Sequence, residues 1–135
     1  RSPSRGLGDV YKRQFKSSKV IFVDIDENAI KLCKKNLKLN YINLNDVYLT
    51  NSFCNVNYIR NNNYDLVFAN ILFTPLYKLT PIFKKIIKPN SFIIISGVLK
   101  KQIPYIINRY NNFGFKEEKR IISEEWGSVI MNLKY

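Results

Sequence analysis

Short runs of apolar residues recur along the chain, and each ends in polar residues or in a turn. Continuous apolar runs of this length are typical of strands that are buried on both faces of a parallel sheet. The pattern therefore predicts strands over residues 19–26 (KVIFVDID), 46–50 (DVYLT), 64–70 (YDLVFAN) and 91–99 (SFIIISGVL).

Amphipathic segments with helical spacing separate these strands. The first covers residues 27–40, and Asp26 or Glu27 is suited to cap its N-terminus. A later one, residues 100–114, is predicted to be a helix that Gly114 ends. The apolar residues of the first helix are predicted to share one face: Ile30, Cys33, Leu37 and Leu39.

The segment between the last two of these strands, residues 74–88, is predicted to be a third amphipathic helix. Thr74 is suited to be its N-cap, and Pro75 is suited to its first turn. Pro81 should kink this helix or divide it in two, because proline cannot donate a backbone hydrogen bond. Residues 89–90 are predicted to turn the chain into the following strand.

The chain closes with two predicted strands, residues 115–126 and 127–135, joined near Gly127. No helical pattern separates them, so they should form an antiparallel hairpin. Together with the earlier alternation of strands and helices, this predicts a doubly wound, mostly parallel α/β sheet. We interpret Trp126 as an edge-strand packing residue and Glu124 and Glu125 as a solvated rim, with substrate contact as the other interpretation.

The first residues contain Gly6 and Gly8 ahead of a strand that ends in acids, which is typical of a nucleotide-binding loop. Such a loop needs a buried strand before it and a packed helix after it, and the flanking residues predict neither. The segment SRGLGDVYKRQ instead resembles a translated sequencing adapter. We therefore expect residues 1–14 to be a technical leader, residues 15–135 to be native, and the sheet to lack its first strand and glycine loop.

The composition excludes several kinds of active site. The 135 residues include no histidine and two widely separated cysteines, Cys33 and Cys54. Usual zinc spacings and nucleophiles activated by histidine are thus excluded, and both thiols are interpreted as packing residues in a reducing compartment. No apolar run reaches the ~18 residues that would span a membrane, and no secretory signal is visible.

The net charge of the chain is +12, from 22 Lys and Arg against 10 Asp and Glu. This excess is compatible with a nucleic-acid partner. The lysines are scattered, however, and Lys, Asn, Ile, Tyr and Phe are all abundant, as A/T-rich codons would produce. We therefore expect solvated surfaces without direct nucleic-acid binding.

Two predicted strands end in polar side chains that could bind a ligand or take part in a reaction. Asp24 could accept hydrogen bonds from both hydroxyls of a ribose, or it could serve as a helix cap. Asn70 is followed by two apolar residues, and amino-group methyltransferases often place Asn or Asp at this point. There the amide oxygen orients the incoming nitrogen, whereas the other interpretation of Asn70 is an ordinary turn residue.

Four stretches taken together resemble one protein family. They are VDIDENAI with the later Asn36 and Asn40, ANILFTPLYKLTP, ISGVLKKQ, and the closing EEWGSVIM. From residue 15 to its end, the chain is similar to the catalytic domain of the bacterial methyltransferases of ribosomal protein L11 (PrmA). The resemblance implies a Rossmann-like, class I S-adenosylmethionine-dependent methyltransferase fold, of which this chain would be the C-terminal part.

The resemblance also implies roles for individual residues. Asp24 matches the acid that binds the ribose of S-adenosylmethionine. Asn70 matches the asparagine near the methionine end of that cofactor and the incoming amine, and it is the candidate catalytic residue. Asn51 and Ser52 lie where related folds contact adenine, and Ile25 either packs on the adenine face or belongs to the core.

The function that the resemblance implies is methylation of lysine side chains and of the N-terminal amine of ribosomal protein L11, by a cytoplasmic monomer. Without the family's glycine loop and N-terminal domain, we expect this chain alone to bind the cofactor weakly or not at all and to be inactive. Three alternatives stay open: a methyltransferase of the same fold acting on RNA or another amine, a non-enzymatic basic RNA-binding module, and a nicotinamide-dependent oxidoreductase.

Overall fold

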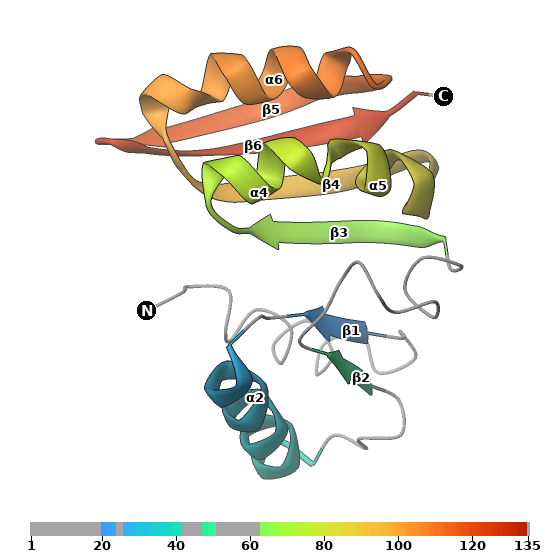
Figure 1. The fold of residues 1–135 in the computed structure, drawn as a ribbon, viewed down its shortest axis with the longest axis vertical. Coiled ribbons are helices and arrows are strands. Elements are labelled where there is room, and N and C mark those ends of the chain that lie inside the picture. The colour runs from blue at the N-terminus through green and yellow to red at the C-terminus, as the bar shows by residue number, and fades with distance from the viewer. Residues whose placement is uncertain (1–19, 24–25, 42–46, 51–62, 135) are drawn as a thin grey trace. The chain divides into compact units, whose positions relative to one another are not determined.

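The computed structural model describes residues 20–23, 26–41, 47–50 and 63–134 (Figure 1). Contacts within the chain divide it into two units, Arg1–Ile59 and Arg60–Tyr135. Among the described residues, no helix is long and apolar enough to cross a membrane.

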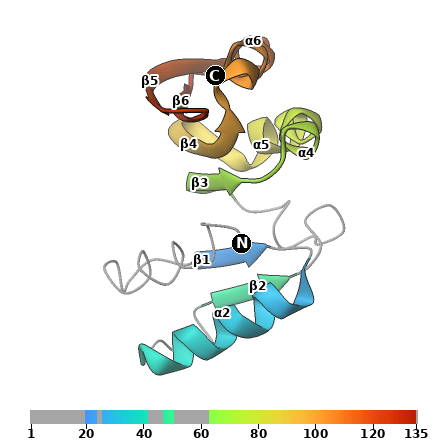
Figure 2. The same ribbon diagram turned by 90° about the vertical axis from the view of Figure 1, so that its left-hand side faces the viewer.

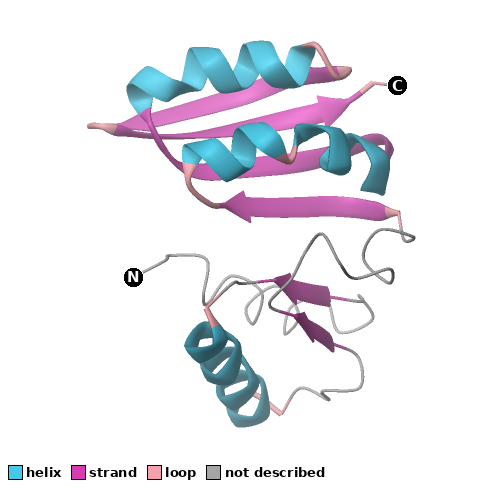
Figure 3. Ribbon diagram, in the orientation of Figure 1, coloured by secondary structure: helices cyan, strands magenta, loops and turns pink. Residues whose placement is uncertain are grey.

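The first unit contains two strands and the helix that connects them, β1 (Val20–Val23), α2 (Glu27–Leu39) and β2 (Val47–Thr50) (Figure 3). β1 and β2 pair in parallel, from Val20 opposite Val47 to Val23 opposite Thr50. A helical crossover between parallel strands is the βαβ unit that the alternating pattern predicts. These three predicted elements are therefore confirmed.

Helix α2 begins and packs largely as its pattern predicts. Asp26 is the N-cap, and its carboxylate accepts a hydrogen bond from the backbone N–H of Asn28 at 2.9 Å. Cys33 and Leu37 are buried, as expected. Leu39 is 66% exposed, so its predicted place on the buried face is wrong. Two residues after Leu37, Leu39 is turned by about 200° around the helix and points away from that face.

The second unit is a four-stranded sheet with its helices. Strand order is β3-β4-β6-β5, with β3 parallel to β4 and both other pairs antiparallel. In chain order the elements are β3 (Tyr64–Asn70), α4 (Phe73–Lys78), α5 (Thr80–Ile86), β4 (Ile87–Leu99), the 3₁₀ turn η3 (Lys100–Gln102), α6 (Ile103–Asn111), β5 (Phe115–Ser123) and β6 (Trp126–Leu133).

The predicted C-terminal hairpin is confirmed, with two corrections. Its turn is formed by Glu124 and Glu125 and not near Gly127, and Glu124 adopts a positive φ of 55°. β6 also lies between β4 and β5, so Trp126 belongs to an internal strand and not to an edge strand. Gly114 was predicted to end the helix, but α6 ends at Asn111, and Gly114, with φ 93°, closes the turn that follows it.

The helical segment between β3 and β4 departs from the prediction at both ends. Pro81 does divide it, and α5 starts at Thr80 with the proline in its first turn. Thr74 is not the N-cap, because α4 already begins at Phe73 and Leu72 occupies the cap without a side-chain hydrogen bond. The predicted turn at residues 89–90 lies inside β4, which begins at Ile87 and contains Asn90 at φ 65°.

The core of the second unit lies between one face of the sheet and the three helices α4, α5 and α6, as the two views show together (Figures 1 and 2). Side chains alternate between the two faces of a strand. Accordingly, β4 and β6 each bury every second apolar residue. These buried residues include Ile93, Ile95, Val129, Met131 and Leu133.

Helices α4 and α6 are joined by two side chains of α6. The buried Tyr110 hydroxyl donates to the backbone carbonyl of Leu76 at 2.9 Å. Burial raises the pKa of the Tyr110 phenol well above its usual range, so the hydroxyl stays protonated and remains a donor. Arg109 lies between two rings, with its guanidinium carbon 4.5 Å from the centre of Tyr77 and 4.7 Å from that of Phe113.

Replacing Tyr110 by phenylalanine keeps the ring and removes the hydroxyl, with its hydrogen bond to the Leu76 carbonyl and its contact with Thr80. We expect Tyr110→Phe to lower the free energy of unfolding by about 1 kcal/mol, measured by urea denaturation. Tyr105→Phe makes the same chemical change on a side chain that is 67% exposed, and it should leave stability within about 0.5 kcal/mol. Equal effects of the two substitutions would contradict the assignment.

Candidate functional site

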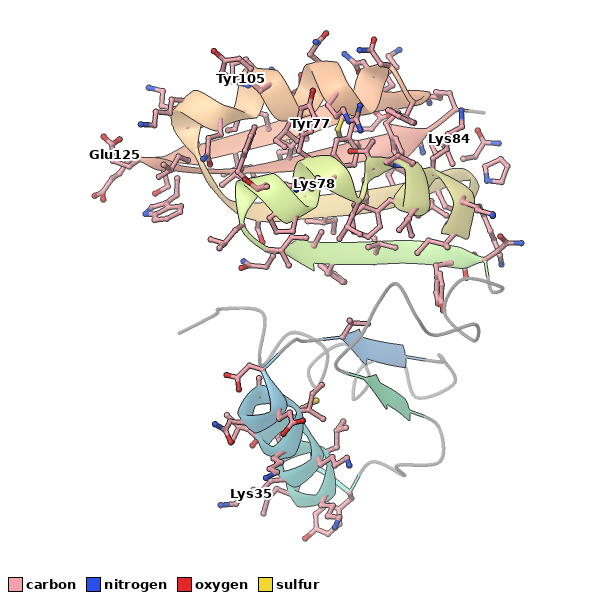
Figure 4. All side chains as sticks on the ribbon, in the orientation of Figure 1. Lys35, Tyr77, Lys78, Lys84, Tyr105 and Glu125 are labelled. Carbon is pink, nitrogen blue, oxygen red and sulfur yellow. The ribbon has the colours of Figure 1, made fainter. Side chains whose placement is uncertain are left out.

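The sheet gathers three of the stretches noted in the sequence at one end. β3 and β4 are parallel, so Asn70 at the end of β3 lies opposite Ser96 near the end of β4. β6 runs the other way and begins at this end, where Trp126 lies opposite Leu99. Figure 4 shows the labelled Glu125 at the end of the unit where α4 also begins. Ligands of open α/β sheets bind outside the carboxyl ends of the parallel strands.

Asn70 is held at this end by a side chain of the neighbouring strand. Its Nδ2 donates a hydrogen bond to Ser96 Oγ at 2.8 Å, and the pair is partly buried. The carbonyl oxygen Oδ1 therefore keeps its lone pairs for another donor. Among the described residues, none donates a hydrogen bond to Asn70 Oδ1.

Gly97 makes room for this carboxamide. It has a positive φ of 75°, which side chains rarely tolerate. A Cβ built on Gly97 would lie 2.9 Å from Asn70 Oδ1 and 3.2 Å from its Cγ and Nδ2. Glycine is thus needed twice here, for the backbone conformation and for the close approach of Asn70. We call Asn70, Ser96 and Gly97 the strand-end site.

Other residues of the same stretches shape the turns around this site. Gln102 Oε1 accepts a hydrogen bond from the backbone N–H of Leu99 at 2.9 Å, which closes the turn into η3 and α6. The backbone N–H of Lys100 donates to the carbonyl of Glu125 at 2.8 Å, which ties the β5–β6 turn to the end of β4. These contacts give Gln102 and the segment containing Glu125 a structural role.

Gly127 and Trp126 complete this arrangement. A Cβ on Gly127 would overlap Cδ1 of Ile103, so the first residue of α6 packs directly on the β6 backbone. Trp126 is 55% exposed, which does not fit the packing role expected of it. Glu124 and Glu125 are exposed, as a solvated rim would be.

A shallow hollow of about 420 Å³ lies just beyond the strand ends. Phe73, Lys101, Gln102 and Tyr105 line it, so it is formed by the starts of α4 and α6 together with η3. The lining consists of two aromatic side chains, one amide and one cation. Among the described residues, no group of three acidic, cysteine or histidine side chains could hold a metal ion.

Of the residues predicted to form a site, the structure describes only Asn70. Asp24, Ile25, Asn51 and Ser52 lie outside the described residues. They directly follow Val23 and Thr50, which are paired at the ends of the parallel strands β1 and β2. Cys54 and the glycines at residues 6 and 8 also lie outside the description.

Sequence reasoning did not assign a role to Ser96 or Gly97 individually. Both stand in the ISGVLKKQ stretch, which was noted for its resemblance alone. The signal that could have identified them was a serine followed by a glycine near the end of the most apolar predicted strand. This strand is the next one along the chain after the strand that ends in Asn70. Such a pair at neighbouring strand ends indicates a shared site when the strands are parallel.

Comparison with known proteins finds one family over nearly the whole chain. The sequence model described as Ribosomal protein L11 methyltransferase (PrmA) matches residues 10–134. A relative with this description from Fusobacterium nucleatum is 33% identical over 96% of the chain, and one from Dictyoglomus turgidum is 30% identical over 93%. The chain spans 38% and 40% of the lengths of these two relatives.

Solved structures show the same fold at lower sequence identity. A ribosomal protein L11 methylase from Lactobacillus delbrueckii superposes with a TM-score of 0.84, at 21% identity, over 99% of this chain and 68% of that one. A putative methyltransferase from Thermoplasma acidophilum superposes with a TM-score of 0.81, at 15% identity, over 97% of this chain and 64% of that one. The predicted class I methyltransferase fold is therefore confirmed.

The contact between Gly127 and Ile103 can be tested by a double-mutant cycle. We expect Gly127→Ala to lower the free energy of unfolding by about 1–3 kcal/mol, because the new methyl group overlaps Ile103 Cδ1. Ile103→Val removes that Cδ1 atom and should cost about 1 kcal/mol in the original chain. In the Gly127→Ala background the same change should be neutral or stabilising, measured by chemical denaturation. Additive effects would contradict the contact.

Proposed function

The chain belongs to the family of ribosomal protein L11 methyltransferases, and from this membership we propose that residues 15–135 are part of the catalytic domain of an S-adenosylmethionine-dependent N-methyltransferase. The proposed substrates are lysine side chains and the N-terminal amine of ribosomal protein L11. We propose that residues 1–14 are not native; the family match, which begins at residue 10, overlaps the last five of them.

The strand-end site is the observation that carries the proposal. An amine attacks as a neutral base, so its lone pair must point at the methyl carbon while its N–H bonds point elsewhere. Asn70 Oδ1 is an acceptor held at the carboxyl end of a parallel strand, where it can receive such an N–H. Positioning of this kind is the main contribution that a direct displacement needs.

S-adenosylmethionine, when bound, supplies the methyl group on a positively charged sulfur. Two features of the described structure fit it: the open acceptor of Asn70, and the missing Cβ of Gly97 beside that acceptor. We propose that Asp24 binds the ribose, that Asn51 and Ser52 contact the adenine, and that Ile25 packs on the adenine ring. Support comes from the pairing of β1 with β2, which brings the starts of both segments to neighbouring strand ends.

A lysine amine has an ordinary pKa near 10.4, so it must lose a proton before it can react. With S-adenosylmethionine bound, transfer would form a nitrogen–carbon bond and break the sulfur–carbon bond, whose electron pair would stay on sulfur. The proton removed from the ammonium passes to water. Asn70 Oδ1 would accept a hydrogen bond from the amine, which favours the neutral amine in the orientation that transfer needs. Asn70 is not proposed to act as a base.

The compartment, the oligomeric state and the binding partners of the protein are proposals as well. We propose a cytoplasmic monomer that does not bind nucleic acid directly. The scattered lysines support the absence of direct nucleic-acid binding, since the net charge of +12 is spread over both units and is not gathered in one basic segment. The names of the relatives support a protein substrate over RNA or a free amine.

Removing the Asn70 carboxamide should abolish most of the transfer. The assay follows a labelled methyl group from S-adenosylmethionine to ribosomal protein L11. The enzymes are the chain itself and a chimera in which the chain replaces the aligned segment of the Fusobacterium nucleatum relative. In the active form, Asn70→Ala should lower kcat on the order of 100-fold.

Asn108→Ala is the matched control, because it makes the same change on the exposed surface of α6 and should leave transfer unchanged. A chimera that folds, binds S-adenosylmethionine and yet transfers no methyl group, while the intact relative does, would contradict the proposed function. Full activity of Asn70→Ala would contradict the role of Asn70 alone.

A further inference from the structure

We infer that Ser96 is a positioning residue: its hydroxyl selects which end of the Asn70 carboxamide faces the substrate, and Gly97 keeps the space that this orientation needs. The inference rests on the proposed function for its meaning in catalysis. The orientation of the Asn70 carboxamide is argued from the contacts of Asn70, Ser96 and Gly97 alone.

The contact joins two neighbouring strands. Asn70 and Ser96 are paired across β3 and β4, so their side chains leave the same face of the sheet. Asn70 Nδ2 lies 2.8 Å from Ser96 Oγ, although the two residues are 26 positions apart in the chain. The contact therefore depends on strand register and not on local chain geometry.

A carboxamide has two different ends, and only one suits an amine. The NH₂ end is a donor and the C=O end is an acceptor. With the NH₂ group held by Ser96, Oδ1 is free to accept an N–H from the incoming amine. In the reversed orientation the amine would meet a second donor, which leaves its N–H without a partner and competes for its lone pair.

Without a partner, the Asn70 side chain would not keep this orientation. The last torsion of asparagine is broad and roughly two-fold, so both ends are accessible unless a hydrogen bond selects one. Ser96 supplies that selection through a lone pair of its hydroxyl. Alanine at this position would leave the Asn70 NH₂ group without its partner.

Gly97 lies against the same carboxamide, since a Cβ there would come within 2.9–3.2 Å of its Oδ1, Cγ and Nδ2. Any Cβ at this position would approach Oδ1 to 2.9 Å, closer than two such atoms ordinarily come. A side chain there would push the acceptor out of place or cover it. Ser96 therefore holds the donor end, while the bare backbone of Gly97 leaves the acceptor end open.

The orientation can be read without any enzymatic activity. In the ¹⁵N-labelled chain, the two side-chain amide protons of Asn70 are identified by their loss in Asn70→Asp. Ser96→Ala should shift these signals and speed their exchange with water, whereas Ser96→Thr, which keeps the hydroxyl, should leave them close to the original. Unchanged Asn70 signals in Ser96→Ala would overturn the inference.

The kinetic consequence is measured in the methyl-transferring chimera. Ser96→Ala should lower kcat roughly 10- to 100-fold and leave the KM for S-adenosylmethionine unchanged, because orientation and not binding is lost. Ser96→Thr should restore most of kcat. Ser128→Ala makes the same change at a half-buried serine of β6 and should leave kcat unchanged.

The outcomes separate the inference from the proposed function. Full kcat in Ser96→Ala, or a loss that Ser96→Thr does not restore, would overturn the positioning role. If the unsubstituted chimera transfers no methyl group, the proposed function fails, and the amide signals of Asn70 still decide whether Ser96 holds its carboxamide.

Discussion

The parallel pairing of β3 with β4 is the constraint on which the described site depends. Parallel strands end on the same side of a sheet, so Asn70 and Ser96 meet only because these two strands run in the same direction and in this register. The divided helix α4–α5 supplies the crossover that makes the parallel pairing possible. A slip of one residue would turn the Ser96 side chain to the opposite face.

Around this constraint, neighbouring residues of the same sequence stretches take different tasks. Gln102 and the backbone of Glu125 fix the turns beyond β4, and Gly127 lets α6 pack closely on β6. Ser96 and Gly97, a few residues earlier, face Asn70. The stretches that resemble one family thus contain two kinds of residue: those that fix the local structure and those that form the strand-end site. Substitutions can test the two kinds separately.

Charge contributes less to this architecture than the composition suggests. Ion pairs of the described residues, such as Lys88 with Asp65 at 3.0 Å, are solvent-exposed, and exposed pairs contribute about 0–1 kcal/mol each. On the edge strand β5, Arg120 hydrogen-bonds Glu117 and lowers the pKa of its carboxyl. Charged side chains on an edge strand also disfavour pairing with another chain. The cohesion of the second unit therefore comes from its apolar core.

The sequence by itself determined the order of strands and helices, a helix cap at Asp26 or Glu27, the break at Pro81 and the position of Asn70 at a strand end. These follow from periodicity and from the local chemistry of single residues, which act over one or two turns. The tertiary structure decided the place of β6 between β4 and β5, the early start of β4 at Ile87, and the contact of Asn70 with Ser96. Each depends on pairing between strands that are distant in the chain, and register is set jointly by both strands and the turns between them, which the pattern of one segment does not show.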